Sequence, residues 1–96
     1  MADCYAYIVS SEKTNQFYIG STRNLEQRLS IHNDQQINTN STRAGIPWKV
    51  YLTIPCATFK QAQAIERHIK RMKSRKYIEN LLKYPELIEG LLKKYG

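Results

Sequence analysis

The sequence predicts an α/β fold of the α+β kind, with a small three-stranded antiparallel sheet flanked by helices in the order ββαβααα. Two short runs of aromatic and β-branched residues stand close together near the start of the chain, and a third follows a long polar stretch. Apolar residues at helical spacing fill the second half. With 96 residues the chain has room for one core, so we expect a single domain over residues 1–96.

The first two strands are expected at Tyr5–Val9 and Phe17–Ile19, with a polar turn at residues 10–16 and Gly20 at the end of the second strand. Strands joined by so short a connection pair most readily as an antiparallel hairpin. Neither run alternates between apolar and polar residues, which indicates strands that are covered on both faces.

The first helix is expected from the capping residues at 21–24 to about His32, with Leu25 and Leu29 on the side that faces the core. Residues 33–45 follow as a polar stretch rich in Asn, Gln, Ser and Thr. Loops of this length usually carry function or are mobile, so we expect a loop here.

The second half begins with a strand at Pro47–Ile54, which Pro55 is expected to stop. Thr58 and Gln61 form a capping-box pattern at the start of the clearest helix. The apolar stripe of this helix comprises Phe59, Ala62, Ile65, Ile69 and Met72.

Two more helices are expected, the first capped by Ser74 and the second with Pro85 at its first position. Their apolar residues are Tyr77, Ile78, Leu81 and Leu82 in the first, and Leu87, Ile88, Leu91 and Leu92 in the second.

The charge balance indicates the kind of partner. Fifteen Lys and Arg against eight Asp and Glu give a formal charge of +7. This excess predicts a polyanionic partner, and nucleic acid is favoured over an anionic membrane surface. The alternative is that the charge serves solubility alone. Cys4 and Cys56 are too few for a disulfide framework or a structural zinc site, and we expect both to be free and buried. We expect no membrane association and a cytoplasmic location, because the sequence contains no apolar run of about 20 residues and no signal-like start.

Four side chains near the start of the chain are candidates for chemistry. Tyr7 and Tyr18 can project their hydroxyls to one face of the hairpin, although tyrosine is also an ordinary strand residue. Arg28 and His32 are four residues apart and lie beside the leucine stripe of the first helix. Each has an ordinary alternative, an arginine that extends to water or a histidine at a helix end.

Glu66 falls within the apolar stripe of the second predicted helix, where a carboxylate requires a partner. That partner is either Lys70, four residues on, or a hard divalent cation. The basic run at residues 67–76 is interrupted by apolar residues at helical spacing, so it belongs to the fold and offers phosphate contacts or a solvated face.

Together these side chains fit metal-assisted cleavage of a phosphodiester, which needs a base, a cation and an arginine on the phosphoryl oxygens. Tyrosine has a reference pKa of about 10, so a nearby cation or arginine would have to lower the pKa of a tyrosine base.

The ordered series resembles the GIY-YIG nuclease superfamily, in particular its small single-domain branch, over roughly residues 4–85. The residues that carry the resemblance are Tyr5-Ala6-Tyr7 at the first signature, Tyr18-Ile19-Gly20 at the second, the segment from Gly20 to Arg28 with His32, Pro47-Trp48-Lys49-Val50, and Glu66 with the basic residues after it. Three positions depart from the pattern. Tyr5 replaces the glycine of the first signature, Ser21 stands where the repair-enzyme branch has lysine, and Tyr84 precedes Pro85 where many relatives have asparagine, with Asn80 as the nearest substitute.

The resemblance implies an α/β/α sandwich and a structure-directed DNA endonuclease of low sequence specificity that uses one Mg²⁺ or Mn²⁺ ion. In that scheme Glu66 holds the metal, Arg28 stabilises the phosphate, Tyr7 or Tyr18 is the base, and the other tyrosine and His32 orient water or phosphate. The predicted nucleic-acid contacts are Arg23, Lys70, Arg71, Lys73, Arg75 and Lys76.

Two other functions remain open. One is a nucleic-acid-binding module that keeps the nuclease fold with little or no turnover. The other is an interaction domain whose basic surface meets an acidic protein. For the endonuclease, specificity could also come from a protein partner.

Overall fold

The computed structural model describes residues 4–34 and 44–96, except the side chain of His32. Its centre is a three-stranded antiparallel sheet with β1 in the middle, in the order β2-β1-β3. The strands are β1 (Cys4–Ser11), β2 (Gln16–Thr22) and β3 (Lys49–Cys56). The predicted hairpin and antiparallel sheet are confirmed.

The hairpin is longer than predicted, because the ladder runs from Tyr5 opposite Thr22 to Ser11 opposite Gln16. The polar residues expected in the turn therefore belong in part to the strands, since ladder hydrogen bonds join backbone groups whatever the side chains are. Asn15 forms the turn with a φ of 53°, in the left-handed region that asparagine tolerates better than most residues.

Pro55 does not stop the third strand, contrary to the prediction. β3 starts at Lys49, two residues later than Pro47, and continues through Pro55, which pairs with Tyr5 of β1. Because β3 is an edge strand, a proline there need not remove a ladder hydrogen bond.

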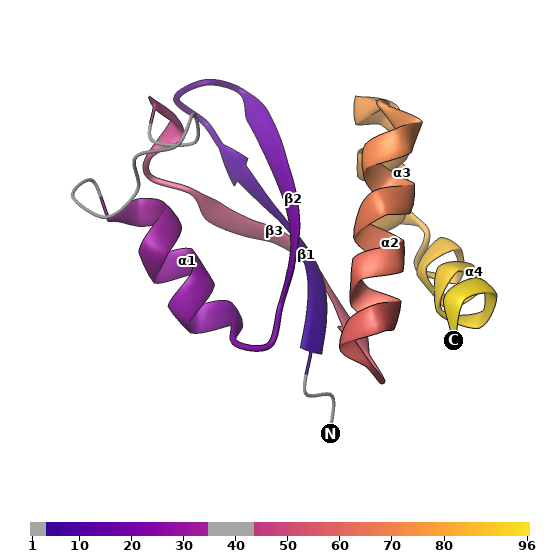
Figure 1. Cartoon of the computed structure of the whole chain (residues 1–96). Coiled ribbons are helices and arrows are strands. Elements are labelled where there is room, and N and C mark those ends of the chain that lie inside the picture. The colour runs from indigo at the N-terminus through magenta and orange to yellow at the C-terminus, as the bar shows by residue number, and fades with distance from the viewer. Residues whose placement is uncertain (1–3, 35–43) are drawn as a thin grey trace.

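Among the described elements, α1 (Leu25–Asn33) alone covers one face of the sheet (Figure 1). The small core under it consists of Tyr7, Val9 and Trp48, with Leu25 and Leu29 of α1 packed against them. The predicted leucine side of the first helix therefore faces the sheet. Tyr7 and Val9 are two residues apart on β1 and so share this face.

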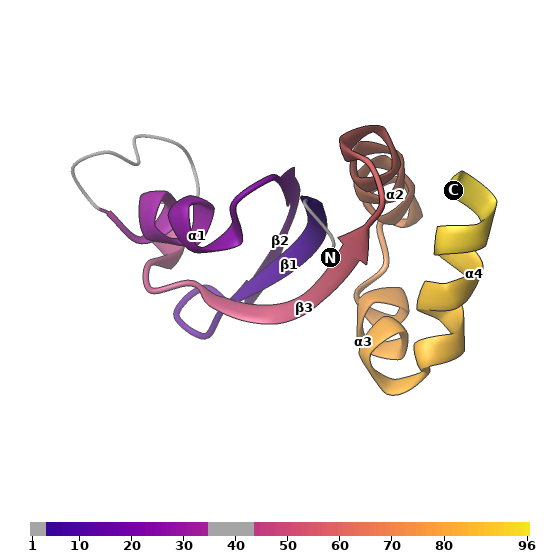
Figure 2. The same cartoon turned by 90° about the horizontal axis from the view of Figure 1, so that it is seen from below.

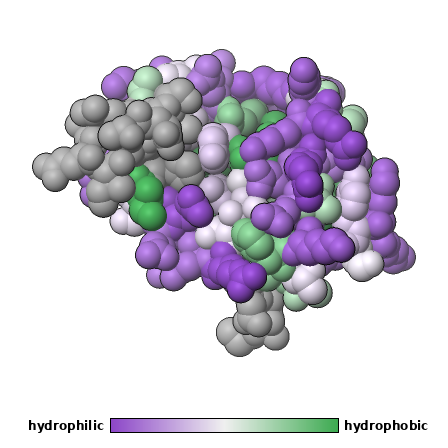
Figure 3. All heavy atoms as spheres, in the orientation of Figure 1, coloured by the Kyte–Doolittle hydropathy of each residue, from purple (hydrophilic) through white to green (hydrophobic). Residues whose placement is uncertain are grey.

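The other three helices gather on the opposite face, so the fold has α, β and α layers (Figures 1 and 2). They are α2 (Phe59–Met72), α3 (Arg75–Lys83) and α4 (Pro85–Tyr95). The chain thus has the predicted mixed architecture and element order. Hydrophilic residues cover much of the helical side of the molecule in Figure 3.

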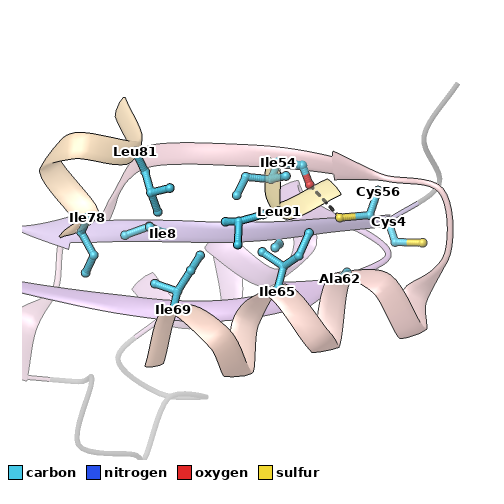
Figure 4. Packing of buried hydrophobic residues seen from close by; sticks show 11 residues of the cluster. Cys4, Ile8, Ile54, Cys56, Ala62, Ile65, Ile69, Ile78, Leu81 and Leu91 are labelled. Carbon is cyan, nitrogen blue, oxygen red and sulfur yellow. Dashed lines mark hydrogen bonds between the residues drawn. The ribbon is translucent and has the colours of Figure 1, made fainter. Parts of the chain in front are cut away.

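The larger core lies between the sheet and these three helices (Figure 4). Its most deeply buried side chains include Ile8 and Ile54 from the sheet, Ile65 and Ile69 from α2, and Leu81 from α3. Cys4 and Cys56 are free and buried, as predicted.

The predicted helix starts are confirmed, since Thr58 accepts from the Gln61 amide and Ser74 accepts from the Tyr77 amide, each at 3.1 Å. Three residues of the predicted apolar sets are exposed instead. Leu87, 37% exposed, lies in the first turn of α4. Met72, 45% exposed, lies in the last turn of α2, beyond the buried Ile69. Leu82, 50% exposed, follows the buried Leu81, so it points about 100° away around the helix.

Within the described ranges, none of the helices combines the length and the apolar character that crossing a membrane requires.

Candidate active site

Tyr7 packs directly over Gly20, its partner across the β1–β2 ladder. A Cβ added to Gly20 would lie 2.6 Å from Tyr7 Cζ and closer still to the hydroxyl oxygen. The tyrosine ring therefore occupies the space that any larger residue at position 20 would need, and it is only 3% exposed. The glycine of the second signature thus makes room for the tyrosine of the first.

The neighbours of Tyr7 set its ionisation. Burial raises the pKa of the Tyr7 hydroxyl well above its ordinary value of 10, and nearby Tyr18 and Glu66 raise it further. The Arg28 guanidinium opposes this and lowers the pKa. The hydroxyl therefore stays protonated at neutral pH, and all three neighbours lie within electrostatic reach of it.

Glu66 joins α2 to the edge strand β2. The Ser21 hydroxyl donates to Glu66 Oε1 at 2.5 Å, and the Lys70 ammonium donates to Oε2 at 2.6 Å. The buried Ile65 and Ile69 fix the rotation of α2 against the sheet, and this turns the adjacent Glu66 toward β2. The carboxylate is 19% exposed, so it is desolvated on one side and open on the other.

From the sequence, the partner of Glu66 is expected to be either Lys70 or a divalent cation, and in the structure Lys70 is in contact with it. A hollow of about 250 Å³ nevertheless borders the carboxylate, lined by Gln63, Glu66 and Arg67. Among the described residues, no group of three or more His, Cys, Asp or Glu side chains could hold a metal ion. One carboxylate beside an open hollow suits Mg²⁺, which typically takes one or two carboxylates and completes its shell with water and substrate phosphates. The residues present therefore fit a divalent cation of this kind.

Tyr18 stands next to this pair on β2. Its ring centroid is 6.0 Å from the Lys70 ammonium and 6.4 Å from the centroid of the Trp48 ring. Tyr18 is half-buried and packs with Tyr7 in the small core, so both tyrosines lie on one face of the hairpin, as predicted.

A groove of about 360 Å³ lies where β2 passes into α1. Its lining residues are Thr22, Arg23, Asn24, Gln27, Arg28, Ile31 and Phe59. The Arg23 guanidinium lies 5.0 Å from the Phe59 ring centroid, and Arg28 is exposed. Asn24 caps α1 through its side-chain oxygen, which accepts from the Gln27 amide at 3.0 Å. Arg23 and Arg28 therefore line one groove, and Arg28 is also within electrostatic reach of Tyr7.

Two predictions fall wholly or partly outside the described residues. His32 belongs to α1, but its side chain lies outside the described part of the structure. The predicted loop at residues 33–45 overlaps residues 35–43, which are also outside it.

Asn33, at the end of α1, carries a contact that the sequence did not indicate. Its side chain accepts from the Trp48 backbone amide at 2.5 Å and donates to the Trp48 carbonyl at 2.9 Å. This pair fixes the segment before β3 against α1. It therefore supports the small core under the two tyrosines.

Apart from Arg23, the predicted nucleic-acid contacts fall into two groups. Lys70, Arg71 and Lys73 are exposed at the end of α2, and Lys76 is exposed on α3. Arg75 instead holds the β1–β2 turn. Its Nη1 donates to the Asn15 carbonyl and its Nη2 to the Asn15 side chain, both at 2.9 Å.

Arg75 makes two further contacts, with its guanidinium 4.6 Å from the Phe17 ring centroid and its Nε 3.8 Å from Glu79 Oε2. Its predicted role toward nucleic acid stays a prediction, beside this structural one. Asn80 is half-buried on α3, and no contact within the described residues joins its side chain to Glu66.

Comparisons with known proteins agree with this arrangement. A family model described as the GIY-YIG catalytic domain, a family of nuclease type, matches residues 3–78. A UPF0213 protein of Bacillus licheniformis is 32% identical over 78 residues, which cover 78% of this chain and 78% of that protein. No solved structure matches the chain.

Proposed function

The chain belongs to the GIY-YIG family, and from that premise we propose that it is an endonuclease that hydrolyses DNA phosphodiester bonds with one Mg²⁺ or Mn²⁺ ion. The observation that carries the proposal is the Glu66 carboxylate, held by Ser21 at the edge of the hairpin within electrostatic reach of Tyr7. A desolvated carboxylate, two tyrosines and an arginine in one place supply the groups that this hydrolysis needs.

Glu66 is the proposed metal ligand. A bound divalent cation would offset the charge that develops on the phosphoryl oxygens and would favour deprotonation of a water. Lys70 holds Oε2 in the absence of a ligand, and its exposed stem allows the ammonium to swing onto a phosphate when DNA is bound. Ser21 keeps hold of Oε1 and so keeps the carboxylate oriented.

The two tyrosines divide the remaining work. Because burial keeps the Tyr7 hydroxyl protonated, we assign Tyr7 to hydrogen-bond donation and to positioning the phosphate or the attacking water. Proton removal then falls to Tyr18, which is half-buried and lies beside the Lys70 ammonium. His32 follows Arg28 by one helix turn and is assigned to orienting water or phosphate.

The arginines and lysines are the proposed DNA contacts. Arg28 and Arg23 share the groove at the start of α1, where a guanidinium can bind two phosphate oxygens at once. Contacts to phosphates position the strand but do not read its sequence. We therefore propose cleavage directed by DNA structure, with any sequence specificity supplied by a protein partner.

Cleavage of labelled nicked and branched DNA in Mg²⁺ tests the proposal. The Glu66→Ala variant is expected to lose at least about 100-fold in rate, the range for removal of one group that stabilises transition-state charge. Glu86→Ala, an exposed glutamate in the first turn of α4, is the matched control and keeps full activity. Cleavage that survives Glu66→Ala would remove Glu66 from the mechanism.

A second function, binding of nucleic acid with little turnover, is favoured by the contact between Lys70 and Glu66. An ammonium 2.6 Å from the carboxylate oxygen competes with any cation for that oxygen. If this function is correct, the wild type binds DNA with a steep salt dependence but does not cleave it. Lys70→Ala then tests whether cleavage appears once the competing ammonium is removed.

A further inference from the structure

A second basic surface lies between α2 and α4. It is an open groove of about 510 Å³, here named the α2–α4 groove. Its lining residues are Ala64, Arg67, Lys70, Arg71, Lys73 and Tyr95. Four of the six are cations, and the single aromatic residue comes from the end of α4. The α4 helix lies beyond residue 78, where the match to the family model ends.

Among the described residues, three of these four cations have no acidic partner. Within the described residues, neither Arg71 nor Lys73 forms an ion pair, and Arg67 donates only to the Gln63 carbonyl of its own helix, at 3.4 Å. Arg67 and Arg71 are one helix turn apart, about 6 Å along the axis, which is comparable to the distance between successive phosphates of one strand. Uncompensated positive charge in this spacing is complementary to a phosphate backbone.

Tyr95 is held at the edge of the groove from two sides. Its hydroxyl is 2.8 Å from His68 Nδ1, and the two rings meet edge-on with centroids 5.6 Å apart. The Gln61 side chain donates to the Leu92 carbonyl at 3.0 Å and so fixes the last turn of α4 to α2. Tyr95 is half-buried, so its ring is oriented but not covered. The Lys94 ammonium lies 5.5 Å from the ring centroid of Tyr95, and this lysine is exposed and free to move aside.

We propose that the α2–α4 groove binds one strand of nucleic acid, with Tyr95 stacking on a base and Arg67 and Arg71 holding the phosphates. A basic groove with an aromatic side chain is the arrangement that binds single strands without sequence preference. A duplex would present stacked bases that the ring cannot reach, and an acidic protein surface would not require the ring. The observations therefore favour a single strand.

The groove also meets the proposed active site. Lys70 lines the groove and donates to Glu66 at 2.6 Å, so a strand that leaves the groove at Lys70 reaches the Glu66 carboxylate. Binding of a strand in the groove does not depend on the proposed endonuclease function. Only the identification of that strand as part of the cleaved substrate rests on it. The inference names a single-stranded segment next to the cut as part of that substrate.

Fluorescence anisotropy with a labelled oligo-dT and a labelled hairpin duplex tests the inference. EDTA is present throughout, so that nothing is cleaved and the result does not depend on the proposed function. Arg71→Gln is compared with Lys83→Gln, which removes the same charge from an exposed position on α3 outside the groove. For oligo-dT, the logarithm of the affinity falls linearly with the logarithm of the salt concentration. We expect this dependence to become less steep by about 0.7 in Arg71→Gln and to stay unchanged in Lys83→Gln.

The aromatic contribution is tested by Tyr95→Leu, which keeps apolar bulk but removes the ring, against Tyr95→Phe, which keeps the ring. We expect Tyr95→Leu to weaken oligo-dT binding about 5- to 150-fold, the range for one stacked base, and Tyr95→Phe to keep most of the affinity. Thermal unfolding checks that both variants fold. If Tyr95→Leu does not fold, the comparison of Arg71→Gln with Lys83→Gln still tests the inference.

Two results would overturn the inference. One is equal oligo-dT binding by Arg71→Gln and Lys83→Gln. The other is a duplex bound at least as tightly as oligo-dT with no effect of Tyr95→Leu, which would assign the groove to a duplex backbone.

Discussion

Replacing Gly20 by alanine tests how the hairpin builds the site. The added Cβ would lie 2.6 Å from Tyr7 Cζ and 2.9 Å from Tyr7 Cε1, so the tyrosine ring must move. Overpacking of this kind typically costs about 1–3 kcal/mol. Lower backbone entropy of the unfolded chain returns about 0.4–1 kcal/mol, because the φ of Gly20 is not positive and alanine is allowed there. The middle of the first range, about 2 kcal/mol, less the middle of the second, about 0.7 kcal/mol, gives an expected net loss of about 1.3 kcal/mol.

Gly90 supplies the matched control, because a Cβ there meets no atom within 4 Å. In the middle of α4, Gly90→Ala should stabilise the protein by about 0.5–1 kcal/mol through helix propensity. Urea unfolding measures both changes, and thermal unfolding should show a fall in Tm of roughly 4–8 °C per kcal/mol lost. Gly20→Ala should also lower DNA cleavage, since the Tyr7 hydroxyl is displaced. A Gly20→Ala protein as stable as the wild type would refute this reasoning.

Three further predictions follow from single contacts. The folded-state pKa of Tyr7 is raised above its unfolded value of about 10, so its contribution to stability is full below pH 10 and is lost as the pH rises further. The free energy of unfolding of the wild type should therefore fall relative to that of Tyr7→Phe above pH 10, and parallel curves would contradict this. Asn33→Ala removes both hydrogen bonds between the Asn33 side chain and the Trp48 backbone, and we expect a loss of about 1–3 kcal/mol in urea unfolding followed by fluorescence of this single tryptophan. Arg75→Lys replaces the planar guanidinium, whose two nitrogens each bond one Asn15 oxygen, with a single ammonium nitrogen. The turn amides should therefore exchange hydrogen faster while those of the α2 core stay protected.

Features that depend on local sequence could be predicted. The hairpin follows from two β-branched and aromatic runs, and the caps at Thr58 and Ser74 follow from side chains three residues from their amide partners. The course of β3 through Pro55 could not, because it depends on that strand lying at the edge of the sheet.

The candidate site divides in the same way. Residue types indicated Tyr7 and Glu66, but the contact between Glu66 and Ser21 spans 45 residues and depends on how α2 rotates against the sheet. From the sequence, either tyrosine could be the base if its pKa were lowered, whereas burial raises the pKa of Tyr7. Desolvation of the Tyr7 hydroxyl depends on how the helices and strands pack around it, and this cannot be predicted from a local sequence pattern.

The central claim is that Glu66 forms the metal centre of a nuclease site at the edge of β2. Titration of the isotope-labelled protein with Mn²⁺, followed by paramagnetic broadening of its backbone amide signals, tests this without any substrate. We predict that the amides of Gly20, Ser21 and Glu66 broaden first, and that this broadening disappears in Glu66→Gln. Broadening centred on another carboxylate, or unchanged in Glu66→Gln, would contradict the claim.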